Sequence, residues 1–341
     1  MLITGLGEAQ QRRLLASTAL IVGCGALGCT AADLLARAGV GAIILIDRDV
    51  VELTNLQRQT LFDEDDARQQ APKAIAAARR LALVNSSIRA VAEVTDFTHR
   101  NAIELIERHR PDVLLDCSDN FQTRFLMNDV AVSRGVPLVY AGVIATGGMQ
   151  YTILPGVTPC LRCIFDAPPA EVGPTCDTAG VLGPAVTIAA SYQAMESLKL
   201  LASVRDRLRH TLVQFDLWKN KHREVSAGPG PRPDCPCCGR RTFEFLDGSR
   251  ADTAAVLCGR HAVQIWPANG QRTPLHELHA RLAAHGDFVL SPVLVRGTLA
   301  GVSGETGTPI ELTVFSDGRT LVRGTSSIER ARALHARYVG T

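Results

Sequence analysis

The sequence lacks most features that mark specialised classes of protein. Aromatic residues make up only 5% of its 341 residues, and the formal net charge is +2. No basic run is interleaved with aromatic residues, so a nucleic-acid-binding surface is not indicated. No apolar stretch is long enough, without charges or Gly/Pro breaks, to span a bilayer. The opening "MLITGLGEAQQRR" also lacks the charged start and apolar core of a secretory leader.

Cysteine, in contrast, is plentiful. Ten cysteines in a chain with no sign of secretion favour a reducing compartment, where clustered thiols bind metal or react. We therefore expect a globular protein of the cytoplasm, long enough to bury a substantial core.

The first part of the chain alternates strand and helix patterns. "TALIVG" predicts a strand, "CGALGCTAADLLARAG" a glycine turn and helix, and "GAIILIDRD" a second strand. The alternation continues to about residue 150, which predicts an α/β domain with a Rossmann-like, doubly wound and mainly parallel sheet. The stretch "CLRCIFDAPPAEVGPTCDTAGVLG" has no periodicity and predicts a loop, and "PAVTIAASYQAMESLKLLA" predicts a long helix.

A Pro/Gly-rich connector, "SAGPGPRPD", separates this pattern from a different one. Beyond about residue 245, strand-like runs such as "FVLSPVLVRG" and "ELTVFSDGRTLVRG" accompany two helix-like segments. We expect two domains, an α/β domain at 1–245 and a small α+β module at 246–341.

A glycine motif lies between the first strand and the first helix. Gly23, Gly25 and Gly28 fit G-x-G-x-x-G, in which the backbone approaches a phosphorylated ligand at a helix N-terminus. Asp47 ends the next strand, where an acid commonly binds ribose. A helix–strand turn without a ligand is the alternative, but the βαβ context and the acid favour a nucleotide. A dehydrogenase would look the same here.

Charged residues near the same sheet edge distinguish the nucleotides. Arg58 follows the second strand, Lys73 starts a helix pattern, and Asp119 and Asn120 follow a later strand. Each alone would usually be solvated surface charge. Together they suit a reaction at the α-phosphate of ATP, where cations and a Mg²⁺-binding carboxylate stabilise developing charge. Hydride transfer to a nicotinamide needs neither.

Four cysteines form two C-x-x-C pairs. Cys160 and Cys163 lie in "PCLRC", and Cys235 and Cys238 lie in "CPCCG". Two such pairs predict a tetrahedral zinc site, which would be structural because four thiolates leave no open position. It would clip the connector onto the first domain. Four buried or free thiols are the alternative, and Cys237 falls outside the C-x-x-C spacing.

At these motifs the chain resembles a known family. "GCGALGC", "DRDVVELTNLQRQ", "PKA", "DCSDN" and "CLRC…CPCC" occur in the order found in the MoeB/ThiF/HesA enzymes, the bacterial relatives of ubiquitin-activating enzymes. The resemblance covers about residues 1–243. It implies an adenylyltransferase that activates the C-terminal glycine carboxylate of a ubiquitin-like sulfur carrier (ThiS or MoaD type) for thiocarboxylate formation, in thiamin or molybdopterin biosynthesis. It also implies a Gly-Gly-ending carrier as partner, a cysteine desulfurase or rhodanese as a possible sulfur donor, and a homodimer.

The resemblance also assigns roles to individual residues. Ala26 would offer its backbone N–H to ATP, Asp47 would bind ribose, and Asp119 would hold Mg²⁺ with Asn120 beside it. Further residues would lie along ATP and its phosphates: Thr54, Asn55, Leu56, Gln57, Arg58 and Lys73.

Cys176, in "PTCDTAGVLGP", matches a nucleophilic position of the family and precedes a predicted helix N-terminus, which favours thiolate. A free loop thiol is the alternative reading of Cys176.

Two regions depart from or extend beyond the resemblance. Relatives carry an arginine-bearing segment before "GLGEAQQRRL", whose arginine reaches the partner subunit's ATP, and this sequence starts after that segment would end. Either the start of the sequence is called late, or the trans arginine is missing, in which case we expect slower adenylation and a less stable dimer. A sulfurtransferase loop that starts at Cys258 would need an arginine at its far end, but position 264 is Gln, so we expect Cys258 to be a packing residue.

Three other functions are compatible with parts of the sequence. The first is an NAD-dependent oxidoreductase. The second is a family member that adenylates a small-molecule or tRNA-bound carboxylate, although the relatives that cyclise a tRNA modification generally lack the zinc cysteines. The third is a non-catalytic scaffold, against which Arg58, Lys73 and Asp119 argue.

Overall fold

The computed structural model describes residues 5–167, 180–250, 254–257, 262–266, 273–305 and 307–340. It divides into two compact units, Met1–Ala251 and Asp252–Thr341. Among the helices in these ranges, none is long and apolar enough to cross a membrane.

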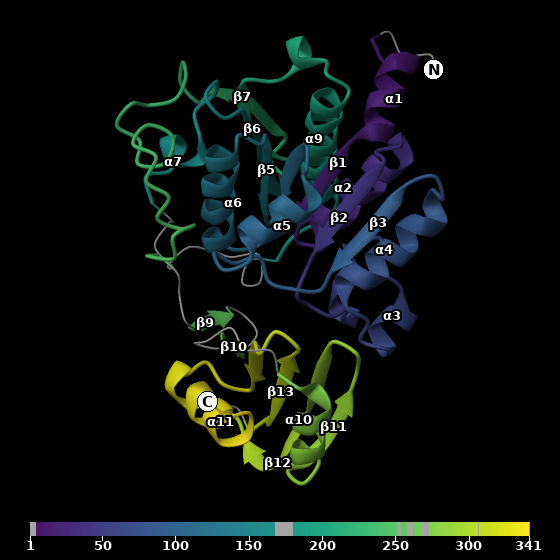
Figure 1. The fold of residues 1–341 in the computed structure, drawn as a ribbon, viewed down its shortest axis with the longest axis vertical. Coiled ribbons are helices and arrows are strands. Elements are labelled where there is room, and N and C mark those ends of the chain that lie inside the picture. Colours follow the sequence, from purple (N-terminus) through teal and green to yellow (C-terminus); the bar gives the residue numbers. More distant parts are fainter. Residues whose placement is uncertain are drawn as a thin grey trace. The chain divides into compact units, whose positions relative to one another are not determined.

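An eight-stranded sheet forms the centre of the first unit (Figure 1). Its strand order is β3-β2-β1-β4-β5-β6-β7-β8. Strands β3 to β5 in that order pair in parallel, and β6, β7 and β8 extend the sheet by antiparallel pairing. The strands are β1 (Thr18–Val22), β2 (Ala42–Ile46), β3 (Arg89–Glu93), β4 (Val113–Asp116), β5 (Leu138–Ile144), β6 (Gly147–Ile153), β7 (Thr211–Asp216) and β8 (Lys221–Ser226).

Helices cover both faces of this sheet because successive strand residues point to opposite sides. In β1, Ile21 packs into one core with α2, α4 and α9, and Leu20 packs into a second core with α5 and α6. The predicted doubly wound α/β fold is therefore confirmed. The helices of this unit are α1 (Glu8–Ala16), α2 (Ala26–Ala38), η1 (Leu53–Asn55), α3 (Glu64–Arg68), α4 (Lys73–Val84), α5 (Ala102–His109), α6 (Phe121–Arg134), α7 (Leu161–Ile164), α9 (Gly183–Leu201) and η2 (Arg205–Arg207).

Several short elements of the first unit were not expected from the sequence, among them α1, α3, α7 and β8. Helix α7 lies inside the stretch expected to be a loop, and it is a single turn that starts at Leu161, with Cys160 as its N-cap. Strand β8 was missed because all its residues, "KHREVS", are exposed. An edge strand with no buried face shows no alternation of apolar and polar residues.

The second unit is a six-stranded antiparallel sheet with the order β11-β12-β13-β14-β10-β9. The run "FVLSPVLVRG", expected to be strand-like, is divided near Ser291 into β11 and β12. The expected Asp317-Gly318 turn joins β13 to β14, and Gly318 has a left-handed φ of +84°. The elements are β9 (Ala254–Leu257), β10 (Ala262–Ile265), α10 (Leu275–Leu282), β11 (Gly286–Leu290), β12 (Leu294–Ser303), β13 (Pro309–Phe315), β14 (Thr320–Arg323) and α11 (Ile328–Tyr338).

Candidate nucleotide and metal sites

The glycine turn between β1 and α2 is closely packed. Gly23 has a φ of +96°, and a Cβ there would lie 2.5 Å from the carbonyl oxygen of Cys117. A Cβ at Gly28 would lie 1.9 Å from the carbonyl oxygen of Gly23. Gly25 is the N-cap of α2 and Ala26 its first residue, so their backbone N–H groups belong to the free N-terminus of the helix. The turn therefore offers a positive helix end that a phosphate can approach.

Asp47 lies beside this turn, directly after β2. Its carboxylate accepts the N–H of Cys24 at 2.6 Å and the N–H of Asp49 at 2.7 Å. Burial raises the pKa of Asp47, while Lys73 and the two N–H donors act in the opposite direction. The side chain is thus fixed at the carboxyl end of β2, where a ribose is commonly bound.

Lys73 is brought to the same place by a short pairing of two loops. Val50 and Pro72 form an isolated antiparallel bridge, and the N–H of Lys73 donates to the carbonyl of Asp49 at 2.9 Å. The Lys73 Nζ lies 3.5 Å from Asp49 Oδ2, and its side chain is only 5% exposed. A buried ammonium beside Asp49 at this edge can neutralise added phosphate charge.

The segment that the sequence predicts to lie along ATP forms the 3₁₀ turn η1 and the residues after it. Asn55 is buried, and its Oδ1 accepts the N–H of Glu52 at 3.3 Å. Arg58 is half-buried and donates to the carbonyl of Thr54 at 3.1 Å. Thr54 and Gln57 are exposed, and Leu56 is half-buried. Asn55 therefore shapes the turn, whereas Arg58 and Gln57 retain solvent-facing surface.

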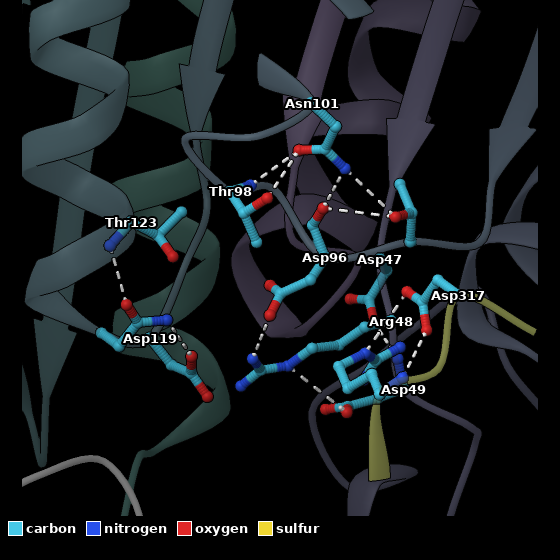
Figure 2. Close-up of polar contacts among 12 residues, drawn as sticks. Asp47, Arg48, Asp49, Asp96, Thr98, Asn101, Asp119, Thr123 and Asp317 are labelled. Carbon is cyan, nitrogen blue, oxygen red and sulfur yellow. Dashed lines mark hydrogen bonds and ion pairs between the residues drawn. The ribbon is translucent and has the colours of Figure 1, made fainter. Parts of the chain in front are cut away.

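Asp119 and Asn120 occupy the loop from β4 to α6, near the same edge (Figure 2). Asp119 is exposed, and its Oδ1 accepts the Asn120 amide at 3.4 Å. Asn120 is the N-cap of α6, where its Oδ1 accepts the N–H of Thr123 at 2.8 Å. The exposed Asp119 carboxylate is suited to a cation, while part of Asn120 is used for capping.

Sequence reasoning missed an ion pair at this edge. Arg48 donates to Asp96 Oδ2 at 2.9 Å and lies 3.9 Å from Asp49 Oδ1. Figure 2 shows Arg48 between Asp49, after β2, and Asp96, on the loop after β3. Asn101 fixes that loop by donating to the carbonyl of Asp96 at 2.7 Å. In the sequence, only the order of acid, base and acid in "DRD" indicated that Arg48 forms an ion pair.

The four cysteines of the two C-x-x-C pairs come together although they are distant in sequence. The Sγ atoms of Cys160, Cys163, Cys235 and Cys238 lie within 4.8 Å of one another. Neighbouring sulfurs are 3.6 Å apart for Cys160 and Cys235, and 3.3 Å apart for Cys163 and Cys238. Four thiolates bound to zinc at about 2.3 Å in a tetrahedron would lie about 3.8 Å apart. The donor set and its spacing therefore fit a zinc ion.

The thiols of the cluster differ in their pKa. Contacts with neighbouring thiols, of which the hydrogen bond from Cys237 is the largest, lower the pKa of Cys160 to about 5, whereas burial raises the pKa of Cys235 and of Cys238. Cys237 itself is buried but is not one of the four grouped sulfurs. Cys24, Cys29 and Cys117 are buried near the glycine turn and pack in the core. Cys176 and Cys258 lie outside the described residues.

Comparisons with known proteins give a consistent picture. The model of the ThiF family matches residues 1–237. The sulfur carrier protein ThiS adenylyltransferase of Bacillus subtilis (strain 168) is 39% identical over 340 residues, which are 99% of this chain and 97% of that protein. The adenylyltransferase and sulfurtransferase MOCS3 of Sus scrofa is 40% identical over 71% of this chain, but the match spans only 52% of that protein. A crystal structure of E. coli MccB with AMPCPP and MccA has a similar fold, with a TM-score of 0.59 at 24% identity over 68% of this chain and 69% of that chain.

Proposed function

Because the chain belongs to the ThiF family, we propose that it is an ATP-dependent adenylyltransferase acting on a ubiquitin-like sulfur carrier protein. The substrate group is the carrier's C-terminal glycine carboxylate, and the product is an acyl-adenylate ready for conversion to a thiocarboxylate. The full-length similarity to a ThiS adenylyltransferase favours a carrier of the ThiS type, and hence thiamin biosynthesis over molybdopterin biosynthesis. MOCS3-like relatives support the same class of reaction.

One observation carries the proposal. Lys73 is held 3.5 Å from Asp49, directly beside Asp47 and the glycine turn. A nicotinamide site for hydride transfer does not require a buried ammonium beside the ribose-binding acid. A site that stabilises charge on phosphate oxygens and departing pyrophosphate needs one.

We assign the nucleotide contacts accordingly. ATP phosphates would approach the N–H groups of Gly25 and Ala26, the ribose would bind Asp47, and Arg58 and Lys73 would face the phosphate chain. Asp119, with Asn120 beside it, would hold Mg²⁺, which supplies charge neutralisation on the phosphates. The other proposed contacts are Gly23, Thr54, Asn55, Leu56 and Gln57.

The chemistry needs no general base. The carrier's carboxylate is already ionised, so one of its oxygens attacks the α-phosphorus while the bond to the β-phosphate oxygen breaks and pyrophosphate leaves with its electron pair. The chain's contribution is to align the two reactants and to stabilise the developing negative charge with Lys73 and Arg58.

Two further assignments concern cysteines. We propose that Cys176 is the nucleophile of carrier transfer or sulfur delivery, a role that rests on its motif in the sequence. The four-cysteine cluster would hold a structural zinc ion, because it offers no open coordination position. Homodimer formation, a cytoplasmic location and a desulfurase or rhodanese as sulfur donor stay predictions from the sequence.

The test is pyrophosphate–ATP exchange with the purified chain and a Gly-Gly-ending carrier. We expect exchange that depends on both Mg²⁺ and the carrier. NADH binding without any exchange would instead support an oxidoreductase. Exchange driven by a small carboxylic acid or a carboxylated tRNA, and not by the carrier, would support the alternative adenylating function.

A further inference from the structure

A single buried amide connects the two cysteine turns. Asn128 lies on α6 and is fully buried. Its Oδ1 accepts the N–H of Leu161, which lies between Cys160 and Cys163, at 2.7 Å. Its Nδ2 donates to the Sγ of Cys237, which lies between Cys235 and Cys238, at 3.2 Å. One side chain on a rigid helix therefore contacts the middle of both turns.

Cys237 provides the second half of this connection. Its side chain is buried, and besides Asn128 it contacts Cys160 and Asp129. Asp129 is also buried, and its Oδ2 accepts the N–H of Phe245 at 2.9 Å. Two neighbouring residues of α6 thus hold the first turn, the second turn and the segment that follows it.

The connection addresses a physical problem of the site. The two C-x-x-C pairs are joined by a long stretch of chain, so bringing them together has an entropic cost that the metal alone would have to offset. Residues around a metal's ligands orient them and commonly affect affinity as much as tenfold or more. Asn128 can set the spacing of the turns because both of its polar groups are already satisfied by them.

We propose that Asn128, acting through Leu161 and Cys237, is a positioning residue for the cysteine metal site. Cys237 is then neither a fifth ligand nor an idle thiol: its sulfur is the point at which α6 holds the second turn. The inference rests on the proposed zinc site, and it does not depend on which carrier the enzyme activates.

The experiment compares zinc binding by full-length variants. Asn128→Leu keeps the side-chain size and removes both hydrogen bonds, Cys237→Ala removes the partner, and Cys237→Ser keeps an acceptor in its place. Zinc content and zinc affinity are measured by chelator competition, and cobalt substitution reports the number of thiolate ligands. We expect Asn128→Leu to weaken zinc binding about tenfold or more. Cys237→Ala should weaken it too, the double variant should add little, and Cys237→Ser should restore much of the affinity.

Gln193→Leu is the matched control. It removes an equally buried amide from α9, where Gln193 bonds the backbone carbonyls of Asp116 and Val139. We expect it to lower the melting temperature while leaving zinc affinity unchanged. If Asn128→Leu behaves in the same way, or fails to fold while Cys237→Ala binds zinc normally, the inference is overturned.

Two other outcomes are also decisive. If the cobalt–thiolate absorption of Cys237→Ala falls by the share of one thiolate, Cys237 is a ligand, and the positioning role is contradicted. A wild-type chain without zinc would remove both the metal site and this inference, whereas pyrophosphate exchange would still test adenylation separately.

Discussion

The glycine motif allows the structural and ligand-binding roles of its residues to be separated by two substitutions. Gly28→Ala would place a Cβ 1.9 Å from the carbonyl oxygen of Gly23, within the core of the turn. Gly25→Ala would place a Cβ no closer than 4.0 Å to any neighbour, and Gly25 has an ordinary φ of −75°. We predict that the first change destabilises the fold, and that the second leaves the fold intact but weakens ATP binding.

The magnitudes follow from the local geometry. At position 28 the obstruction is backbone, so α2 must shift to make room for the Cβ. Such overpacking costs about 1–3 kcal/mol, and the better helix propensity of alanine returns about 1 kcal/mol. Because the Cβ would lie only 1.9 Å from the carbonyl oxygen of Gly23, we expect the cost to exceed the gain. Each kcal/mol lost lowers the melting temperature by about 2–4 °C in a unit of this size.

At position 25 the folded state is nearly unaffected. Alanine is a weaker N-cap than glycine by at most about 1 kcal/mol, and the reduced entropy of the unfolded chain returns about 0.4–1 kcal/mol. The added methyl group would, however, keep a phosphate from approaching this backbone. The phosphate would then lose hydrogen bonds to the N–H groups, which are worth about 1.5–3 kcal/mol each. Because 1.4 kcal/mol corresponds to tenfold in affinity, the ATP dissociation constant should rise about tenfold or more.

Thermal unfolding and ATP titration of the two variants test this reasoning. Wild-type ATP affinity in a folded Gly25→Ala variant would show that no phosphate approaches the turn. An unchanged melting temperature in Gly28→Ala would show that α2 is not held against Gly23 as described.

Three further outcomes are expected. Lys73→Ala should abolish most pyrophosphate exchange. Arg80 is an exposed charge on the same helix, and Arg80→Ala should leave exchange largely intact. Equal losses in the two variants would contradict a contact between Lys73 and phosphate. Cys176→Ser should leave exchange intact and impair thiocarboxylate formation, measured by mass spectrometry of the carrier. Burial raises the pKa of Asp116, so the unfolded chain ionises first as pH rises from about 4. Stability should then fall as pH rises toward the folded-state pKa of Asp116, and Asp116→Asn should flatten that fall in thermal unfolding.

Much of the fold could be predicted because buried parallel strands have a strong pattern. β1 and β2 are continuous apolar runs, and a glycine turn and an acid follow them in a fixed order. The same order predicts that Asp47, Lys73 and Asp119 reach one sheet edge, because carboxyl ends of parallel strands meet there. Strand β8 could not be predicted, since every one of its side chains is exposed and its pairing depends on β7.

The surroundings of each site were harder to predict than its main residues. Lys73 is recognisable from "PKA", but its place beside Asp49 depends on the bridge between Val50 and Pro72. Arg48 would be taken for surface charge, and only the folded loop after β3 brings Asp96 to within 2.9 Å of it. These partners come from separate loops, so no local spacing in the sequence records their contact.

Cys237 illustrates the same limit in the metal site. Spacing separates it from the proposed ligands Cys235 and Cys238, and spacing alone leaves it without a role. Its role depends on Asn128, a polar residue inside a helix whose neighbours are mostly buried. A buried amide in a helix usually has a specific partner, because an unpaired one would be destabilising. Asn128 within "FLMNDVAV" was therefore a signal that some chain segment crosses α6 there, and only the structure identifies that segment as the two cysteine turns.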